Sequence, residues 1–216
     1  MRTAAVVTGI AAMFIVLCPP QANGQVQVGI SATDRGLQSF YLAIGEYYRV
    51  PEREVVVIRG RHIPDEEIPV VFFISQRAHV EPALIMNMRT RGQSWMDISL
   101  HFGLGSEVYY VPAREVSGPP YGKAYGYYKN KPRNKWKAIR LSDGDIVNFV
   151  NLRFVTEHYG YDPPAVMRMR GEGKSFVVIN DEVKTRSHGR GKDYKGEGKG
   201  RGQGKGKGKH KGGKGD

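Results

Sequence analysis

Apolar residues in the central part of the chain recur at helical spacing, as in Leu84, Ile85 and Met88 or in Val166 and Met167. This spacing predicts helices at residues 37–48, 52–60, 65–77, 82–91, 94–103, 143–158, 163–171 and 175–184. The sequence therefore predicts an all-α body over residues 37–184.

The same pattern occurs more than once along the chain. The stretch "EPALIMNMRTRGQSWMDI", ending at Ile98, aligns with "DPPAVMRMRGEGKSFVVI", ending at Ile179, at an offset of 81 residues. A fainter copy ends at Ile68, at an offset of 30 residues, and has His62 where the other two copies have glycine. Recurrence at about 30 residues is typical of short helical hairpin units that stack around a shared core.

Each unit has a simple physical interpretation. A proline begins a short helix, a glycine ends it in the left-handed conformation, and a serine caps the next helix, which buries an aromatic residue. These residues are Pro82, Gly92, Ser94 and Trp95 in one copy and Pro163, Gly173, Ser175 and Phe176 in the other, with Pro51 opening the fainter copy. The internal alignment also pairs Arg59, Arg89 and Arg170.

Residues 88–111 resemble a helix-turn-helix DNA-binding unit through "G-x-S-W-x-x-I" followed by "F-G-L-G". A unit of that kind needs a recognition helix that enters the major groove. The segment "SEVYYV" at that place is ended by Pro112, which cannot continue a helix. We therefore interpret the stretch as a helix, a glycine turn and a second helix that pack as one unit.

The first 24 residues have the layout of a secretory signal peptide. Arg2 precedes an apolar stretch from Ala4 to Cys18, and small residues lie before Gln25. We expect residues 1–24 to be removed, the protein to be exported to the periplasm or the extracellular space, and no transmembrane segment to remain. The single cysteine would be lost with the signal, so disulfides would not support the fold.

The net charge of +12 is concentrated in two segments, since residues 103–140 carry +6 and residues 186–216 carry +8. The first segment interrupts the repeated units as a basic aromatic insertion. Its glycine and proline content excludes a long helix and permits an irregular loop or a short hairpin. The second segment is a Gly/Lys-rich tail that we expect to be disordered, because it has almost no apolar side chain to bury.

The insertion supplies the candidate ligand-binding residues, in which rings alternate with cations. They are Tyr121, Lys123, Tyr125, Tyr127, Tyr128, Lys129, Lys131, Arg133, Lys135, Trp136, Lys137 and Arg140. Rings beside cations suit single-stranded nucleic acid, through stacking and phosphate neutralisation, and they also suit anionic glycans. The alternative is that the tyrosines pack on the helical body while the lysines are merely solvated.

No catalytic signature accompanies these features. The sequence has no H-E-x-x-H, no G-x-S-x-G and no phosphate-binding glycine loop, so we predict no catalytic residue, no cofactor and no metal site. The acidic run Asp65, Glu66 and Glu67 is interpreted as charge that complements the start of a helix. As a whole the chain resembles a group of exported bacterial helical-repeat proteins with a "GPPYGKAYGYYKN" segment, a resemblance that implies no activity.

These observations lead us to expect an exported, non-enzymatic binding or structural protein of the bacterial envelope. It would contact anionic polymers, such as wall glycan, lipopolysaccharide or nucleic acid, through the insertion and the polycationic tail. One alternative is an envelope hydrolase whose carboxylates converge near the insertion, and another is a DNA-binding helix-turn-helix protein. The sequence leaves the ligand and the oligomeric state open.

Overall fold

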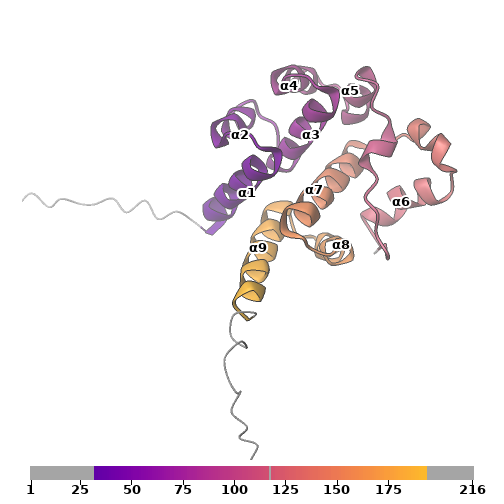
Figure 1. Cartoon of the computed structure of the whole chain (residues 1–216). Helices are drawn as coiled ribbons and strands as arrows, with labels where there is room; N and C mark the ends of the chain where they lie inside the picture. The colour runs from indigo at the N-terminus through magenta and orange to yellow at the C-terminus, as the bar shows by residue number, and fades with distance from the viewer. Residues whose placement is uncertain (1–31, 117, 194–216) are drawn as a thin grey trace, which may run out of the picture. The chain divides into compact units, whose positions relative to one another are not determined.

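The computed structural model describes residues 32–116 and 118–193, and every regular element among them is a helix (Figure 1). The α-helices are α1 (Ala32–Tyr48), α2 (Glu52–Arg59), α3 (Ile68–Ala78), α4 (Pro82–Thr90), α5 (Trp95–His101), α6 (Tyr121–Lys129), α7 (Asp143–Tyr159), α8 (Pro163–Gly171) and α9 (Phe176–Asp193). Short 3₁₀ helices are η1 (Asp65–Glu67), η2 (Ser106–Tyr109) and η3 (Arg133–Ala138). The prediction of an all-α body is confirmed, whereas the predicted signal peptide lies outside the described residues.

Two predicted boundaries were wrong. Helix α1 begins at Ala32 rather than at residue 37. Helix α9 continues to Asp193, so the first eight residues of the predicted tail at 186–216 are helical, and the rest of that tail lies outside the described residues. The extension has a physical reason, because each residue added to an existing helix gains a backbone hydrogen bond without a new nucleation cost.

The insertion contains a helix that the sequence prediction missed. Its residues 103–140 form no strand where the structure describes them, so the hairpin alternative is wrong. Helix α6 forms there because Tyr121, Tyr125 and Tyr128 share one helical face and are all buried. Packing of that face outweighs the low helix propensity of the two glycines in α6.

Residues in the left-handed conformation follow several of the helices. Gly92 has a φ of 85° and Gly173 a φ of 86°, as expected for glycines after short helices. His62, which replaces glycine in the fainter copy, has a φ of 60° and so takes the same left-handed conformation. The three aligned segments thus have a positive φ at the same position, even where the glycine is absent.

Replacing Gly173 by Ala and, in a separate variant, Gly126 by Ala should change stability in opposite directions. A Cβ at either position meets no atom within 4 Å, so sterics with neighbours do not decide the outcome. Gly173→Ala should cost about 1–2 kcal/mol because its backbone is left-handed. Gly126→Ala should instead stabilise by about 0.5–1 kcal/mol, because the residue lies inside α6. Urea unfolding of both variants measures the signs, and equal signs would contradict the assigned backbone conformations.

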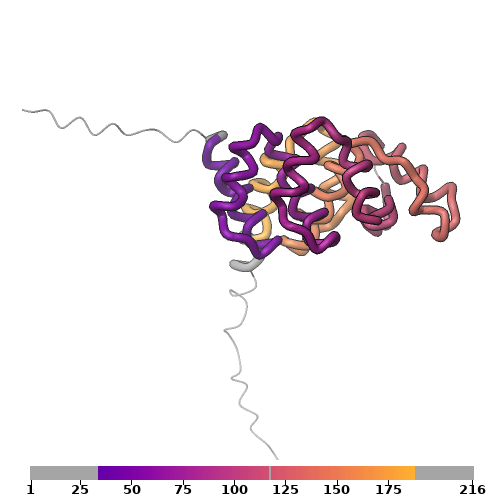
Figure 2. Tube along the Cα trace, turned by 90° about the horizontal axis from the view of Figure 1, so that it is seen from above, coloured from indigo at the N-terminus to yellow at the C-terminus, as the bar shows by residue number. Residues whose placement is uncertain are grey.

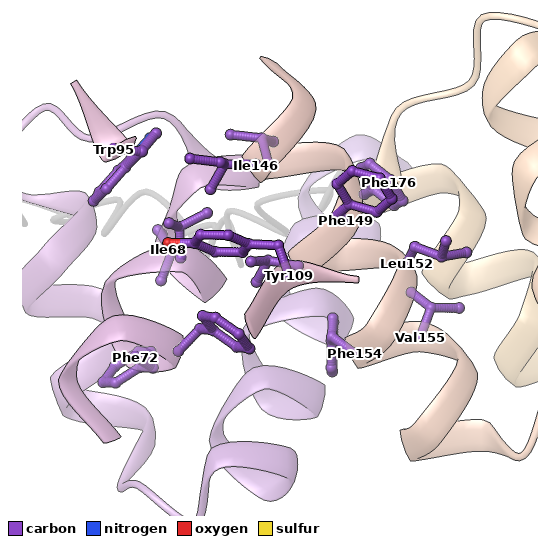
Figure 3. Packing of buried hydrophobic residues seen from close by; sticks show 14 of the residues in the cluster. Ile68, Phe72, Trp95, Tyr109, Ile146, Phe149, Leu152, Phe154, Val155 and Phe176 are labelled. Carbon is purple, nitrogen blue, oxygen red and sulfur yellow. The ribbon is translucent and has the colours of Figure 1, made fainter. Parts of the chain in front are cut away.

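The core is centred on α3 and α7, which pack against each other. Helix α3 is buried continuously from Ile68 to Ser75, and α7 is buried over most of its length between Ile146 and Thr156. Figure 3 shows core members from several helices, among them Trp95, which is fully buried. Helix α1 packs on α9, and Figures 1 and 2 both place α6 and its flanking segments away from α1 and α2.

Candidate functional site

The three carboxylates of η1 each contact an arginine from a different helix. The pairs are Asp65 with Arg59 (3.9 Å), Glu66 with Arg170 (2.9 Å) and Glu67 with Arg89 (2.9 Å). These arginines are the three that the internal alignment pairs. The acidic run was interpreted only as charge that complements a helix start, and its ion pairs with distant helices were missed. The arginine that recurs in the internal alignment was a sequence signal for these pairs.

Arg89 is held by groups from η1, α5 and α7. Its Nε and Nη2 donate to the two carboxylate oxygens of Glu67, both at 2.9 Å, and its Nη1 donates to Asp143 at 2.6 Å. The guanidinium also lies 4.6 Å above the ring centre of Trp95. Burial opposes the charged form of Arg89, but hydrogen bonds to Glu67 and Asp143 outweigh it and raise the pKa above its usual value.

Arg170 has a matching environment. Its Nη1 and Nη2 donate to the two carboxylate oxygens of Glu66 at 3.2 and 2.9 Å, and its Nε donates to Asn148 at 3.1 Å. Its guanidinium lies 4.7 Å from the ring centre of Phe176. The backbone N–H of Phe176 donates to Glu66 at 2.6 Å, just as the N–H of Trp95 donates to Asp143 at 2.7 Å.

Carboxylates therefore do converge in this protein, but at η1 and the start of α7 rather than at the insertion. Those of Glu66, Glu67 and Asp143 accept hydrogen bonds from arginines and backbone N–H groups. A cavity of about 850 Å³ adjoins them, with apolar side chains such as Leu37 and an acidic rim that includes Asp181. An acidic rim repels anions, so this cavity does not suit the expected polymer ligand.

Three of the candidate ligand-binding tyrosines pack in the core instead. Tyr121 and Tyr128 are 1% exposed and Tyr125 is 7% exposed. Their rings contact Phe149 of α7, with centroid distances between 5.1 and 6.2 Å. Each hydroxyl donates to a backbone carbonyl, those of Asn148, Val111 and Ser106. Buried rings of this kind cannot stack on a polymer, so their assignment as ligand contacts was wrong and the packing alternative holds for them.

Tyr127 and Trp136 remain partly exposed. The Trp136 indole N–H donates to the carbonyls of Tyr128 and Lys131 at 3.1 and 3.0 Å, which fixes η3 against α6. The Trp136 ring also contacts Tyr110, at a centroid distance of 4.6 Å. The Tyr110 and Trp136 rings line a cavity of about 540 Å³ together with Lys129.

The seven basic candidates lie on the surface. All seven are exposed. Of these seven, only Arg140 forms an ion pair with another described residue, at 3.5 Å from Asp97. Residues 116–142 contain no Asp or Glu. We call the other six the cationic edge: Lys123, Lys129, Lys131, Arg133, Lys135 and Lys137.

The buried tyrosines predict a specific alkaline titration. Burial is the main cause that raises the pKa of Tyr121, Tyr125 and Tyr128 above the usual value. Because the folded pKa exceeds the unfolded one, their contribution to stability is complete below about pH 10 and is lost as the pH rises further. We expect the Tyr121→Phe difference spectrum at 295 nm to show tyrosinate only when circular dichroism reports unfolding. Tyrosinate from Tyr121 near pH 10 in folded protein would contradict this packing.

Over residues 32–116 and 118–193, no group of three or more His, Cys, Asp or Glu side chains is placed to hold a metal ion. In the same part of the chain, no helix is both long and apolar enough to cross a membrane. No family model, curated protein or solved structure matches the chain.

Proposed function

We propose that the protein is an exported, non-enzymatic binding or structural component of the bacterial envelope that contacts anionic polymers through the cationic edge. The observation that carries this proposal is the arrangement of the insertion, in which Tyr121, Tyr125 and Tyr128 are buried and the cations are exposed. Export rests on the signal-like layout of residues 1–24, which lie outside the described part of the chain.

The cationic edge suits a polyanion for two reasons: no nearby carboxylate in the sequence neutralises its charge, and the backbone that carries the cations is fixed. Its six side chains come from 15 consecutive residues with no carboxylate among them. The backbone that carries them is fixed, since Tyr121 and Tyr128 anchor α6 to α7 and Trp136 anchors η3 to α6. Bringing cations to a polyanion releases counterions, which favours binding whatever the monomer sequence.

Selectivity would come from the partly exposed rings beside this edge. Tyr110 and Trp136 line the same cavity as Lys129, so a planar base or a sugar ring entering it would lie next to a cation. The tail from residue 194 onward would add reach and affinity but no selectivity, because its lysines alternate with glycine.

Charge-removal variants of the full chain test this proposal. Lys129, Lys131 and Lys135 changed together to Gln should weaken binding to a single-stranded oligonucleotide. The plot of log K against log salt concentration should flatten by about 2, because each lost phosphate contact removes about 0.7 from the slope for a single strand. Lipopolysaccharide and anionic wall glycan, as further probes, should show the same direction of change.

The matched control removes three charges that are also exposed but lie elsewhere, with Arg53, Arg61 and Arg91 changed to Gln. This control should retain the affinity and the salt slope of the unmodified protein. A second variant that lacks residues 194–216 separates the contribution of the tail from that of the edge. Equal weakening by the two triple variants would show non-specific charge attraction and would overturn the proposal.

A further inference from the structure

A third cavity, distinct from the cationic edge, lies where the end of α1 meets α3 and α7. Its volume is about 450 Å³, within the usual range for small-ligand pockets. Its lining includes Tyr48, Arg49, Phe73, Arg77, Arg153 and Glu157. Three of these residues are arginines and only Glu157 is acidic.

Two buried polar groups on the lining residues have no hydrogen-bond partner among the described residues. They are the hydroxyl of Tyr48, a residue only 3% exposed, and the Nε of Arg153. Leaving a buried donor unpaired costs about 1–3 kcal/mol, so native proteins rarely do so without a reason. Tyr48 and Arg153 both line the cavity, so an acceptor that reached these two groups from it would remove that cost.

The charges of the cavity point to an anion. The guanidiniums of Arg77 and Arg153 lie 4.5 and 5.8 Å from the ring centre of Phe73, so two cations share one small region. Burial, followed by the charge of Arg153, lowers the pKa of Arg77, which reports their proximity. Glu157 is the only carboxylate of the lining, and it already accepts hydrogen bonds from Arg153 and Tyr47.

Arg153 is held in place by groups other than the ligand. Its Nη2 donates to the carbonyls of Val108 and Tyr110 at 3.2 and 2.8 Å, and its Nη1 donates to Glu157 at 3.3 Å. Arg77 has no ion pair within 4 Å in the described part of the chain. Arg153 is therefore held by three acceptors, whereas Arg77 contacts the Phe73 ring and has no carboxylate within ion-pair distance among the described residues.

We infer that this cavity binds a phosphate group, with Arg77, Arg153 and the Tyr48 hydroxyl as its donors. The three arginines and one carboxylate leave an excess of two positive charges, which matches the charge of a phosphate monoester near neutral pH. Guanidiniums also have the geometry to donate two hydrogen bonds to such a group. The inference is independent of the proposed function, since it involves no residue of the cationic edge.

Phosphate titrations at constant ionic strength test the inference on the full chain. Inorganic phosphate should raise the melting temperature above that in chloride of equal ionic strength, and calorimetry should detect binding. Phenyl phosphate, as the second probe, distinguishes a free ion from a phosphate group carried on a larger molecule. Binding of either supports the site, and no specific effect of either probe would overturn it.

Tyr48→Phe is the sharpest variant, because it removes only the unpaired hydroxyl. Without phosphate its melting temperature should equal or exceed that of the unmodified protein, while its phosphate affinity should fall at least 5-fold. Arg77→Met should lose at least 10-fold in affinity, and Arg91→Met, an exposed arginine outside the cavity, should lose none. A lower melting temperature of Tyr48→Phe without phosphate, or unchanged affinity in both cavity variants, would overturn the inference.

Discussion

Replacing Trp95 by Ala should lower the free energy of unfolding by about 3–5 kcal/mol, the usual range for a large aromatic residue removed from a core. Trp95 is fully buried, and its ring also lies beneath the guanidinium of Arg89. The variant therefore loses apolar burial and a cation–π contact and leaves a cavity. Urea denaturation monitored by circular dichroism measures the loss.

Leu84→Ala is the matched control for this variant, because Leu84 is 45% exposed on α4, the helix before Trp95. It should change the free energy of unfolding by no more than about 0.5 kcal/mol. Phe176→Ala should resemble Trp95→Ala, since Phe176 is also fully buried and lies beneath Arg170. A loss below about 1 kcal/mol for Trp95→Ala would mean that the ring is not a core residue.

Arg170→Ala should cost about 2–3 kcal/mol, less than the 3–5 kcal/mol typical of a fully buried pair. The expected loss is smaller because solvent screens the pair, whose side chains are 23% exposed for Arg170 and 24% exposed for Glu66. The truncation leaves the Glu66 carboxylate without its cation, and the Asn148 side chain and the Lys174 carbonyl without a donor. Chemical denaturation at neutral pH and moderate salt measures the effect.

Two further variants identify the cause of that loss. Arg168 lies on the same helix and is exposed, so Arg168→Ala should change stability by about 0.5 kcal/mol or less. Arg170→Lys keeps the charge but loses the paired donors, and it should recover only part of the stability. Equal losses for Arg168→Ala and Arg170→Ala would show that the network around Glu66 contributes nothing.

Most of the helices could be predicted because their signals are local. Ser94 accepts a hydrogen bond from the N–H of Asp97, and Ser142 forms a capping box with Asp145, as their positions before apolar runs suggest. Helix α6 was not predicted, because Gly122 and Gly126 have low helix propensity. The spacing of its tyrosines, one every three or four residues, was the signal that would have found it.

The same spacing explains the errors in the candidate site. The composition of the insertion shows aromatic residues next to basic ones but not which of them are buried. The rotation of α6 about its own axis decides that Tyr125 faces α7 while Lys123 faces solvent. The cavity lined by Arg77 and Arg153 had no sequence signal, because these arginines lie on different helices and come close only after α3 packs on α7. Long-range pairing of this kind requires the tertiary structure.

The position of the polymer on the protein tests the proposed function most directly. Amide chemical shifts of the ¹⁵N-labelled full chain can be followed during titration with a single-stranded oligonucleotide at moderate salt. We predict that the largest shifts among the helices fall in residues 121–140, which carry the cationic edge. Shifts concentrated in α1–α5, with residues 121–140 unchanged, would contradict the proposed function.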